Sequence, residues 1–145
     1  MDRYGAVLLA NTIWPTGSLL PFKLMQESLF ALTSHLNVMS AFFELRTYKV
    51  FPGKMKEWLR YMEKTIIPFQ VSKGMVIHGS FSVQDDDETY IWIRRFKNLE
   101  HKDNLYEEVY KSDRWVKEIS PIVATLIDRD AIVVKNLQST DLSIM

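Results

Sequence analysis

The pattern of apolar and polar residues changes character at Met39. Upstream of it only four residues are charged: Asp2, Arg3, Lys23 and Glu27. Downstream, short segments of alternating or continuous apolar residues separate longer ones in which apolar residues recur at steps of three and four. These are the patterns of strands and amphipathic helices. They predict one folded domain over residues 39–145. We expect residues 1–38 to be an extension outside that domain, or the product of a start assigned too far upstream.

Four segments have the composition of strands, being rich in aromatic and β-branched residues. They are residues 42–50, 75–84, 88–96 and 129–137. Pro52-Gly53 supplies a turn after the first segment. The acidic stretch Asp85–Asp87 predicts that the second and third segments form a hairpin.

Helices are predicted between these strands. The first starts near Lys54, and its apolar stripe comprises Met55, Trp58, Leu59, Met62, Ile66 and Phe69. Pro68 is expected to bend it or end it early. Asn98 is a suitable cap for a second helix, whose inner side carries Leu105, Tyr106, Val109 and Tyr110. After a turn led by Trp115, Ser120-Pro121 predicts the cap and first position of a further short helix.

The resulting order is β-α-β-β-α-β, an α+β ferredoxin-like fold in which helices cover one face of a four-stranded antiparallel sheet. In "TYIWIRRF", residues 89–96, Ile91, Ile93 and Arg95 share one face of the strand and alternate with Tyr90, Trp92, Arg94 and Phe96. We expect helices over the aliphatic face, leaving the aromatic face bare. Large apolar patches seldom stay exposed, so this predicts a homodimer whose sheets face each other around a mixed aromatic and charged interior.

The charge balance argues against nucleic acid as a partner. Eighteen basic and eighteen acidic residues leave no net field to attract phosphates. The uncharged run over residues 4–22 is interrupted by Pro15, Gly17 and Pro21, so no integral membrane segment is predicted. The chain has no cysteine, its three histidines lack zinc spacing, and no phosphate-binding loop occurs, so neither a metal nor a cofactor is predicted.

The candidate site lies on the predicted interior face. Its members are Glu44, Arg46, Tyr48, His78, Trp92 and Arg94. A carboxylate beside guanidinium groups in a dry cavity can hold an anionic or carbonyl ligand through a bidentate contact. The same charges can instead form a structural ion pair that balances buried charge. His78 is the best acid–base candidate in the sequence, or else a wall residue. Tyr106, Tyr110 and Trp115 are interpreted as core residues.

Three blocks of the chain resemble one family. They are "FELRTYKVFPGKMKEWLRYMEKTIIPFQ", "TYIWIRRF" and "LYEEVYKSDRWVKEISP". In order and spacing they resemble the NIPSNAP family over residues 42–145. The resemblance implies a dimeric α/β barrel of ferredoxin-like subunits with a start near Met39. It also implies a cytoplasmic location for a bacterial-type member and a mitochondrial one for a eukaryotic member. It implies no catalytic residues.

Three functions remain open. The first is a dimeric barrel of NIPSNAP type that binds a small organic ligand without catalysis. The second is an enzyme of the monooxygenase or isomerase kind, with Tyr48, His78, Trp92 and Arg94 around its substrate. The third is a protein-interaction module with a solid interior. An interior cavity would favour the first two, and chemical change of the ligand would separate them.

Overall fold

The computed structural model describes residues 22–143, apart from the side chains of residues 36–39. The chain divides into two compact units that meet between Val38 and Met39. The helix α2 (Phe22–Met39), which the sequence pattern did not predict, belongs to the first unit except for its last residue. The uncharged run falls almost entirely outside the described residues. Within them, no helix is both long and apolar enough to cross a membrane.

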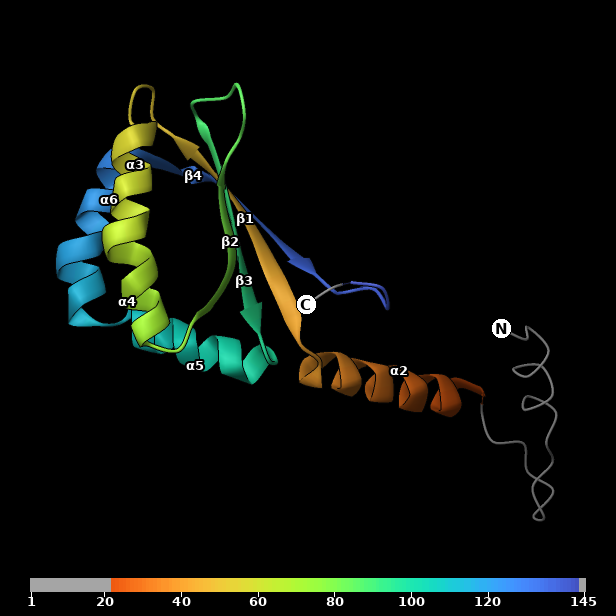
Figure 1. The fold of residues 1–145 in the computed structure, drawn as a ribbon. Coiled ribbons are helices and arrows are strands. Elements are labelled where there is room, and N and C mark those ends of the chain that lie inside the picture. Colours follow the sequence, from red (N-terminus) through yellow and green to blue (C-terminus); the bar gives the residue numbers. More distant parts are fainter. Residues whose placement is uncertain (1–21, 144–145) are drawn as a thin grey trace, which may run out of the picture. The chain divides into compact units, whose positions relative to one another are not determined.

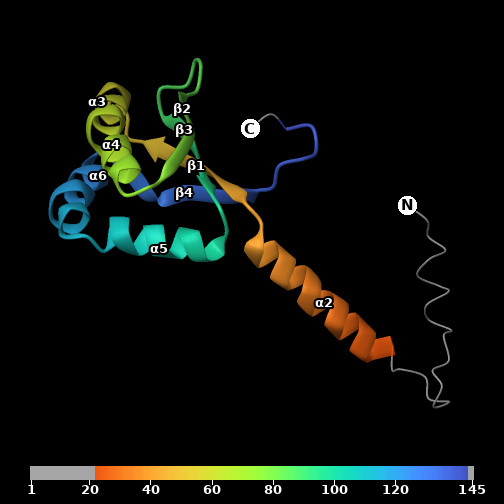
Figure 2. The same ribbon diagram turned by 60° about the horizontal axis from the view of Figure 1, so that its bottom comes forward.

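The second unit has the predicted α+β architecture (Figure 1). Its strands are β1 (Phe42–Val50), β2 (Val76–Ser82), β3 (Thr89–Phe96) and β4 (Ile127–Leu137), which pair antiparallel in the order β2-β3-β1-β4. Its helices are α3 (Met55–Tyr61), α4 (Ile67–Ser72), α5 (Leu99–Tyr110) and α6 (Ser120–Leu126). Figures 1 and 2 show these helices gathered on one side of the sheet.

Two helical segments continue through a proline, so Pro68 does not end its helix early. A π-helical turn (Met62–Ile66) joins α3 to α4, and another (Trp115–Ile119) leads directly into α6. Each is followed within two residues by proline, which has no N–H to donate. A π turn widens the helix locally, so the strict α-helical hydrogen bond that proline cannot make is not required there. Ser120 is therefore helical rather than a cap.

The predicted caps and turns elsewhere are confirmed. The Asn98 side chain accepts a hydrogen bond from the His101 amide at 2.8 Å and begins α5. Ser112 Oγ accepts a hydrogen bond from the Trp115 amide at 3.2 Å. In the acidic hairpin, Asp86 Oδ1 accepts the amides of Glu88 and Thr89. These local bonds fix where each element starts and therefore which residues face inward.

The helices cover the opposite face of the sheet from the one predicted. In β3, Tyr90, Trp92, Arg94 and Phe96 are at most 1% exposed, whereas Ile91, Ile93 and Arg95 are only partly buried. The aromatic rings fill the space between sheet and helices: Trp58 of α3, for example, lies edge-on to Tyr90, with ring centroids 5.6 Å apart. Bulky rings suit this gap because burying them removes the most apolar surface from water. The expectation of a bare aromatic face was wrong.

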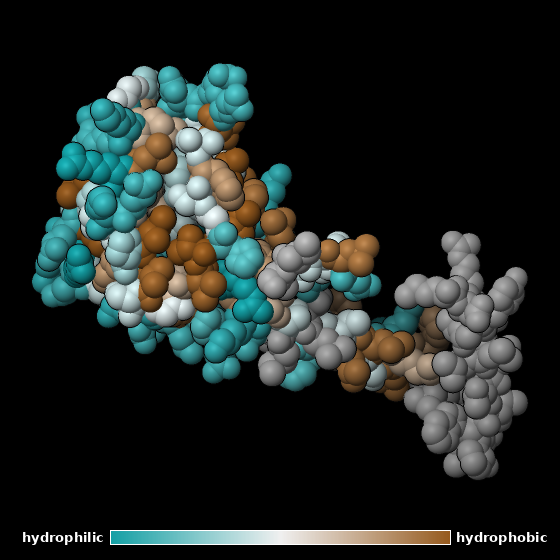
Figure 3. Space-filling model, in the orientation of Figure 1, coloured by the Kyte–Doolittle hydropathy of each residue, from teal (hydrophilic) through white to brown (hydrophobic). Residues whose placement is uncertain are grey.

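The uncovered face of the sheet, which we call the open face, is aliphatic with a few aromatic and basic side chains. Its most exposed apolar residues are Val76 (43% exposed), Phe81 (51%), Val133 (49%) and Leu137 (39%). Their strand partners are Arg95, Ile91, Thr47 and Phe43 respectively, and Leu45 pairs with Ile93 on the same face. Figure 3 shows hydrophobic surface along the course of β2. Within the described part of the second unit, no helix covers the open face (Figures 1 and 2).

Candidate functional site

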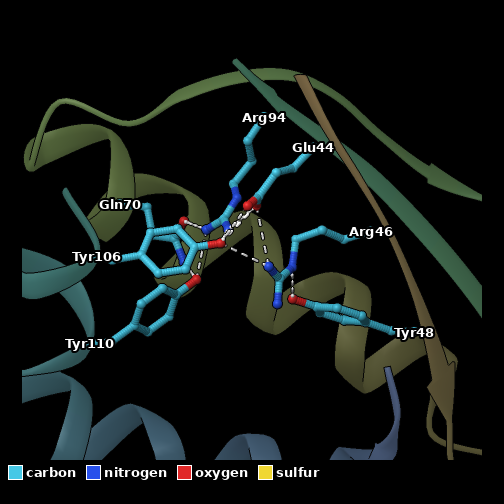
Figure 4. Close-up of polar contacts among 7 residues, drawn as sticks. All are labelled: Glu44, Arg46, Tyr48, Gln70, Arg94, Tyr106 and Tyr110. Atoms are coloured by element: carbon cyan, nitrogen blue, oxygen red, sulfur yellow. Dashed lines mark hydrogen bonds and ion pairs between the residues drawn. The ribbon is translucent and has the colours of Figure 1, made fainter. Parts of the chain in front are cut away.

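Arg94 lies at the centre of a buried polar network beneath the helices (Figure 4). Its Nη2 donates to Glu44 Oε2 at 2.7 Å and to the Tyr106 hydroxyl at 2.6 Å. Its Nη1 donates to Gln70 Oε1 at 3.1 Å and to the Tyr110 hydroxyl at 2.6 Å. β1, α4 and α5 thus each contribute partners to one side chain of β3. Arg94 is fully buried, and such a charge is tolerated only when it is paired in this way.

The Glu44 carboxylate accepts hydrogen bonds from three neighbouring side chains, those of Arg94, Arg46 and Tyr106. Besides Arg94, its Oε2 accepts from Arg46 Nη1 at 3.3 Å, and the Tyr106 hydroxyl lies 2.8 Å from both carboxylate oxygens. Glu44 and Arg94 are cross-strand partners, and Arg46 lies two residues further along the same face of β1. The predicted pairing of Glu44, Arg46 and Arg94 is therefore present in the structure.

Arg46 connects the network to open space. Its Nε donates to the Tyr48 hydroxyl at 2.9 Å, and its Nη1 donates to Glu44 and, at 3.0 Å, to the Tyr106 hydroxyl. Its Nη2 makes no hydrogen bond to a described residue, and in Figure 4 no dashed line reaches it. The Arg46 side chain remains 14% exposed.

A cavity of about 180 Å³ adjoins Arg46 between the sheet and the helices. The lining is mostly aromatic and aliphatic, with a few polar groups. Its members are Arg46, Tyr48, Trp58, Met62, Ile66, Gln70, Trp92, Tyr110, Trp115, Ser120, Val123, Ile127, Arg129 and Ile132. At the second arginine of the lining, Arg129 donates to the hydroxyl and carbonyl oxygens of Ser120. An apolar cavity with a few convergent polar groups is the usual form of a small-molecule site.

Comparison with known proteins shows the family to which the chain belongs. The NIPSNAP family profile matches residues 43–134, which run from β1 through the helices into β4. The chain belongs to the NIPSNAP family. No functionally curated protein matches it significantly. Within the described residues, no cluster of histidine and carboxylate side chains is arranged to hold a metal ion.

Solved structures with the same fold come from several bacteria. A NIPSNAP family protein of Agrobacterium tumefaciens is 23% identical, with a TM-score of 0.64 over 72% of this chain and 90% of that one. A NIPSNAP-like domain protein of Burkholderia xenovorans is 17% identical, with a TM-score of 0.66 over 74% and 91%. A proposed antibiotic biosynthesis monooxygenase of Caulobacter crescentus is 13% identical, with a TM-score of 0.56 over 76% and 99%. At these identities the likeness establishes the fold alone.

His78 lies away from the cavity of this NIPSNAP domain. The register of β2 shifts between Ile77 and Gly79, so His78 occupies a bulge and the alternation of faces restarts after it. Its ring lies 5.0 Å from that of Phe43 on the open face, and the side chain is exposed. The expectation that His78 lies on the interior face with the other candidate residues was wrong, because strict alternation does not hold across a bulge.

Three members of the network escaped the sequence analysis. Tyr106 and Tyr110 were assigned to the core, and Gln70 was not considered. The two tyrosines are one helical turn apart, and their rings meet edge-on at 5.0 Å, which is the core contact expected. The sequence nonetheless held a signal. A buried tyrosine needs a hydrogen-bond partner for its hydroxyl group, and the two charged residues of the strand that both tyrosines face can be that partner.

The charge state of Glu44 follows from its neighbours. Burial alone would raise the pKa of the carboxyl group, but the Arg94 charge and the hydrogen bonds from Arg94 and Tyr106 outweigh it and hold the pKa below its ordinary value of 4.5. Burial also raises the pKa of the Tyr48 hydroxyl, which therefore keeps its proton at neutral pH. The network contains a carboxylate, two guanidinium groups and neutral phenols.

Acid should weaken the NIPSNAP domain through Glu44. As pH falls from about 4.5 toward the lowered folded pKa, the unfolded chain binds a proton that the folded chain excludes, so the free energy of unfolding decreases. Urea unfolding of the wild type between pH 7 and pH 3 should detect this loss. Glu44→Gln should be less stable at pH 7 but lose less on acidification, whereas Glu108→Gln, on the exposed side of α5, should behave as the wild type. If the free energy of unfolding fell equally with pH in all three proteins, Glu44 would not be the group responsible for the loss.

Proposed function

We propose that this protein binds a small organic molecule in the cavity beneath its helices and does not transform it. The observation that carries the proposal is the cavity itself, because it is lined by aromatic rings on several sides and has an arginine with an unused N–H pair in its wall. A domain acting only as a protein-interaction module has no need of such an interior. Well-packed protein interiors leave few voids larger than a water molecule.

The size of the cavity indicates the size of the ligand. An apolar cavity of roughly 150 Å³ suffices for benzene in a small protein. A volume of about 180 Å³ therefore suits a single six-membered ring with a small substituent. The rings of Trp58, Trp92 and Trp115 in the lining favour an aromatic or other flat apolar group.

The same lining argues for binding over catalysis. The histidine that sequence analysis favoured as an acid–base group lies on the open face, with its ring against Phe43. The polar groups that remain around the cavity are arginines, tyrosines, an amide and a serine. The fold shared with a proposed monooxygenase adds no reacting residue, so the enzyme hypothesis has no support beyond architecture.

We further propose that two copies pair through the open face. Val76, Phe81, Val133 and Leu137 together with the partly buried Leu45 and Ile93 form an apolar surface across all four strands. A sheet face of this composition is stable in water when a second sheet packs on it. The homodimer would leave each cavity intact, because each cavity lies between the sheet and its own helices. The bacterial relatives favour a cytoplasmic location.

Benzamide, an uncharged probe of the expected size, should bind the wild-type chain. Three of the four tryptophans line the cavity, so a titration followed by tryptophan fluorescence reports its occupancy directly. Val123→Phe replaces a small aliphatic side chain of the lining with a phenyl ring that occupies the cavity. This variant should fold but show no fluorescence response to benzamide. Ile122→Phe, at the adjacent exposed position of α6, should bind like the wild type. Binding by Val123→Phe at wild-type affinity would place the probe elsewhere.

Native mass spectrometry of gently purified full-length protein tests whether the protein retains a natural ligand. A retained mass of a few hundred daltons or less, absent from Val123→Phe, is the expected result. Conversion of the released compound on incubation with fresh protein would overturn the proposal of binding without catalysis.

A further inference from the structure

Hydrogen-bond donors outnumber acceptors around the cavity. Arg46 carries five N–H bonds, of which one goes to Tyr48, two go to Glu44 and Tyr106, and the two on Nη2 have no partner among the described residues. The Tyr48 hydroxyl accepts from Arg46 and donates to none of the described residues. The Tyr110 hydroxyl likewise accepts from Arg94 and Gln70 and has its own proton left over.

The acceptors of the network are already used. Both oxygens of Glu44 are engaged by Arg94, Arg46 and Tyr106, and Gln70 Oε1 accepts from Arg94. None of the described residues that line the cavity is acidic. Two indole N–H groups of the lining tryptophans and Nε of Arg94 are also buried without an acceptor. The protein supplies more donors here than it can satisfy, and unsatisfied buried donors are costly.

Positive charge likewise exceeds negative charge around the cavity. Arg46 and Arg94 are both permanently protonated, whereas Glu44 is the one carboxylate in contact with them among the described residues. One positive charge is therefore unbalanced at the wall of a cavity of low polarity. Arg129, whose side chain also lines the cavity, adds a second positive charge toward solvent. Outside water, a charge is stabilised by an opposite charge at close range.

We propose that the ligand of this cavity is a small aromatic monocarboxylate, held by Nη2 of Arg46. This inference rests on the proposed binding function and names its ligand class. A carboxylate has acceptors only, so it can accept from Nη2 of Arg46 and from the hydroxyl groups of Tyr48 and Tyr110 without leaving a donor of its own unpaired. Its single negative charge balances the network, and its ring occupies the aromatic part of the cavity.

The geometry of Arg46 makes it the recognition residue. Its Nε and Nη1 are fixed by Tyr48, Glu44 and Tyr106, so the guanidinium plane is held in one orientation while Nη2 stays free (Figure 4). A donor that is already oriented loses little entropy when it binds. Arg94, by contrast, has all four of its Nη hydrogens engaged, and its side chain does not line the cavity.

Benzoate and benzamide test the charge requirement on the full chain at neutral pH. The two probes have nearly the same shape, and benzoate alone is anionic. Benzoate should bind at least about tenfold more tightly than benzamide, since a hydrogen bond to a charged group is stronger than a neutral one. Equal affinities would overturn the anionic ligand while leaving the proposed binding function standing. Failure of both probes to bind would overturn the two together.

Arg46→Gln tests the recognition residue. The variant removes the charge and should weaken benzoate binding about tenfold or more, while benzamide affinity stays near the wild-type value. Arg95→Gln, on the open face, removes the same charge from the molecule and should change neither affinity. An unchanged ratio of the two affinities in Arg46→Gln would overturn the role of Arg46. If that variant does not fold, the benzoate-to-benzamide ratio of the wild type still decides the proposal.

Discussion

Replacing Arg94 with methionine is expected to lower the free energy of unfolding by about 3–5 kcal/mol. The substitution leaves Glu44 buried without its closest cation and removes the common partner of Gln70, Tyr106 and Tyr110. Methionine keeps similar length and flexibility, so the loss comes from charge and hydrogen bonds rather than from a large cavity. This is a large fraction of the stability of a domain of this size.

The neighbouring arginine provides the control. Arg95 lies on the open face and is only partly buried, so Arg95→Met should change stability by less than about 1 kcal/mol. Urea unfolding of both variants at one protein concentration gives the comparison. Equal effects of the two single arginine substitutions would contradict the network.

The elements of the fold were predictable because they depend on local periodicity. The strand over residues 42–50 matches the prediction at both ends, and β3 differs by a single residue at its start. The cap at Asn98 was also identified, since its chemistry involves only the next three residues. Such features require no knowledge of what packs against the chain.

The choice of face was not predictable by the same means. Alternation in residues 89–96 separates two sets of side chains, but it does not say which set meets the helices. The aliphatic residues Ile91 and Ile93 favoured the set that contains them as the covered one, and each set carries one arginine, a residue that is seldom buried. What reverses that expectation is the set of partners on α4 and α5, at least 12 residues away in sequence. Tertiary hydrogen bonds, invisible to a local pattern, made the burial possible.

The two sides of the sheet therefore differ in chemistry. The face beneath the helices combines aromatic rings with a charged network and a cavity, and we assign ligand binding to it. The open face is mainly aliphatic and provides a surface on which another sheet can pack. The doubled arginine at positions 94 and 95 follows from this division: one guanidinium organises the interior, while the other lies on the open face.

Ile93→Glu is expected to raise the dissociation constant of the homodimer by about a thousandfold or more. Ile93 lies on the open face in β3, between Leu45 and Gly79 of the adjacent strands, so a carboxylate there would enter the proposed interface. In a twofold dimer each substitution occurs twice, and burying an unpaired charge costs several kcal/mol, where each 1.4 kcal/mol is a factor of ten. Sedimentation equilibrium at micromolar concentration measures the change.

Ile122→Glu is the matched control for the dimer. Ile122 is exposed on α6, on the helical side of the sheet, so this variant should remain as dimeric as the wild type. A dimeric Ile93→Glu with an unchanged dissociation constant would assign the interface to another surface, and a monomeric wild type would refute pairing altogether. Because the cavity lies on the other side of the sheet, monomeric Ile93→Glu should still bind benzoate. Pairing and ligand recognition would then be separable properties of one sheet.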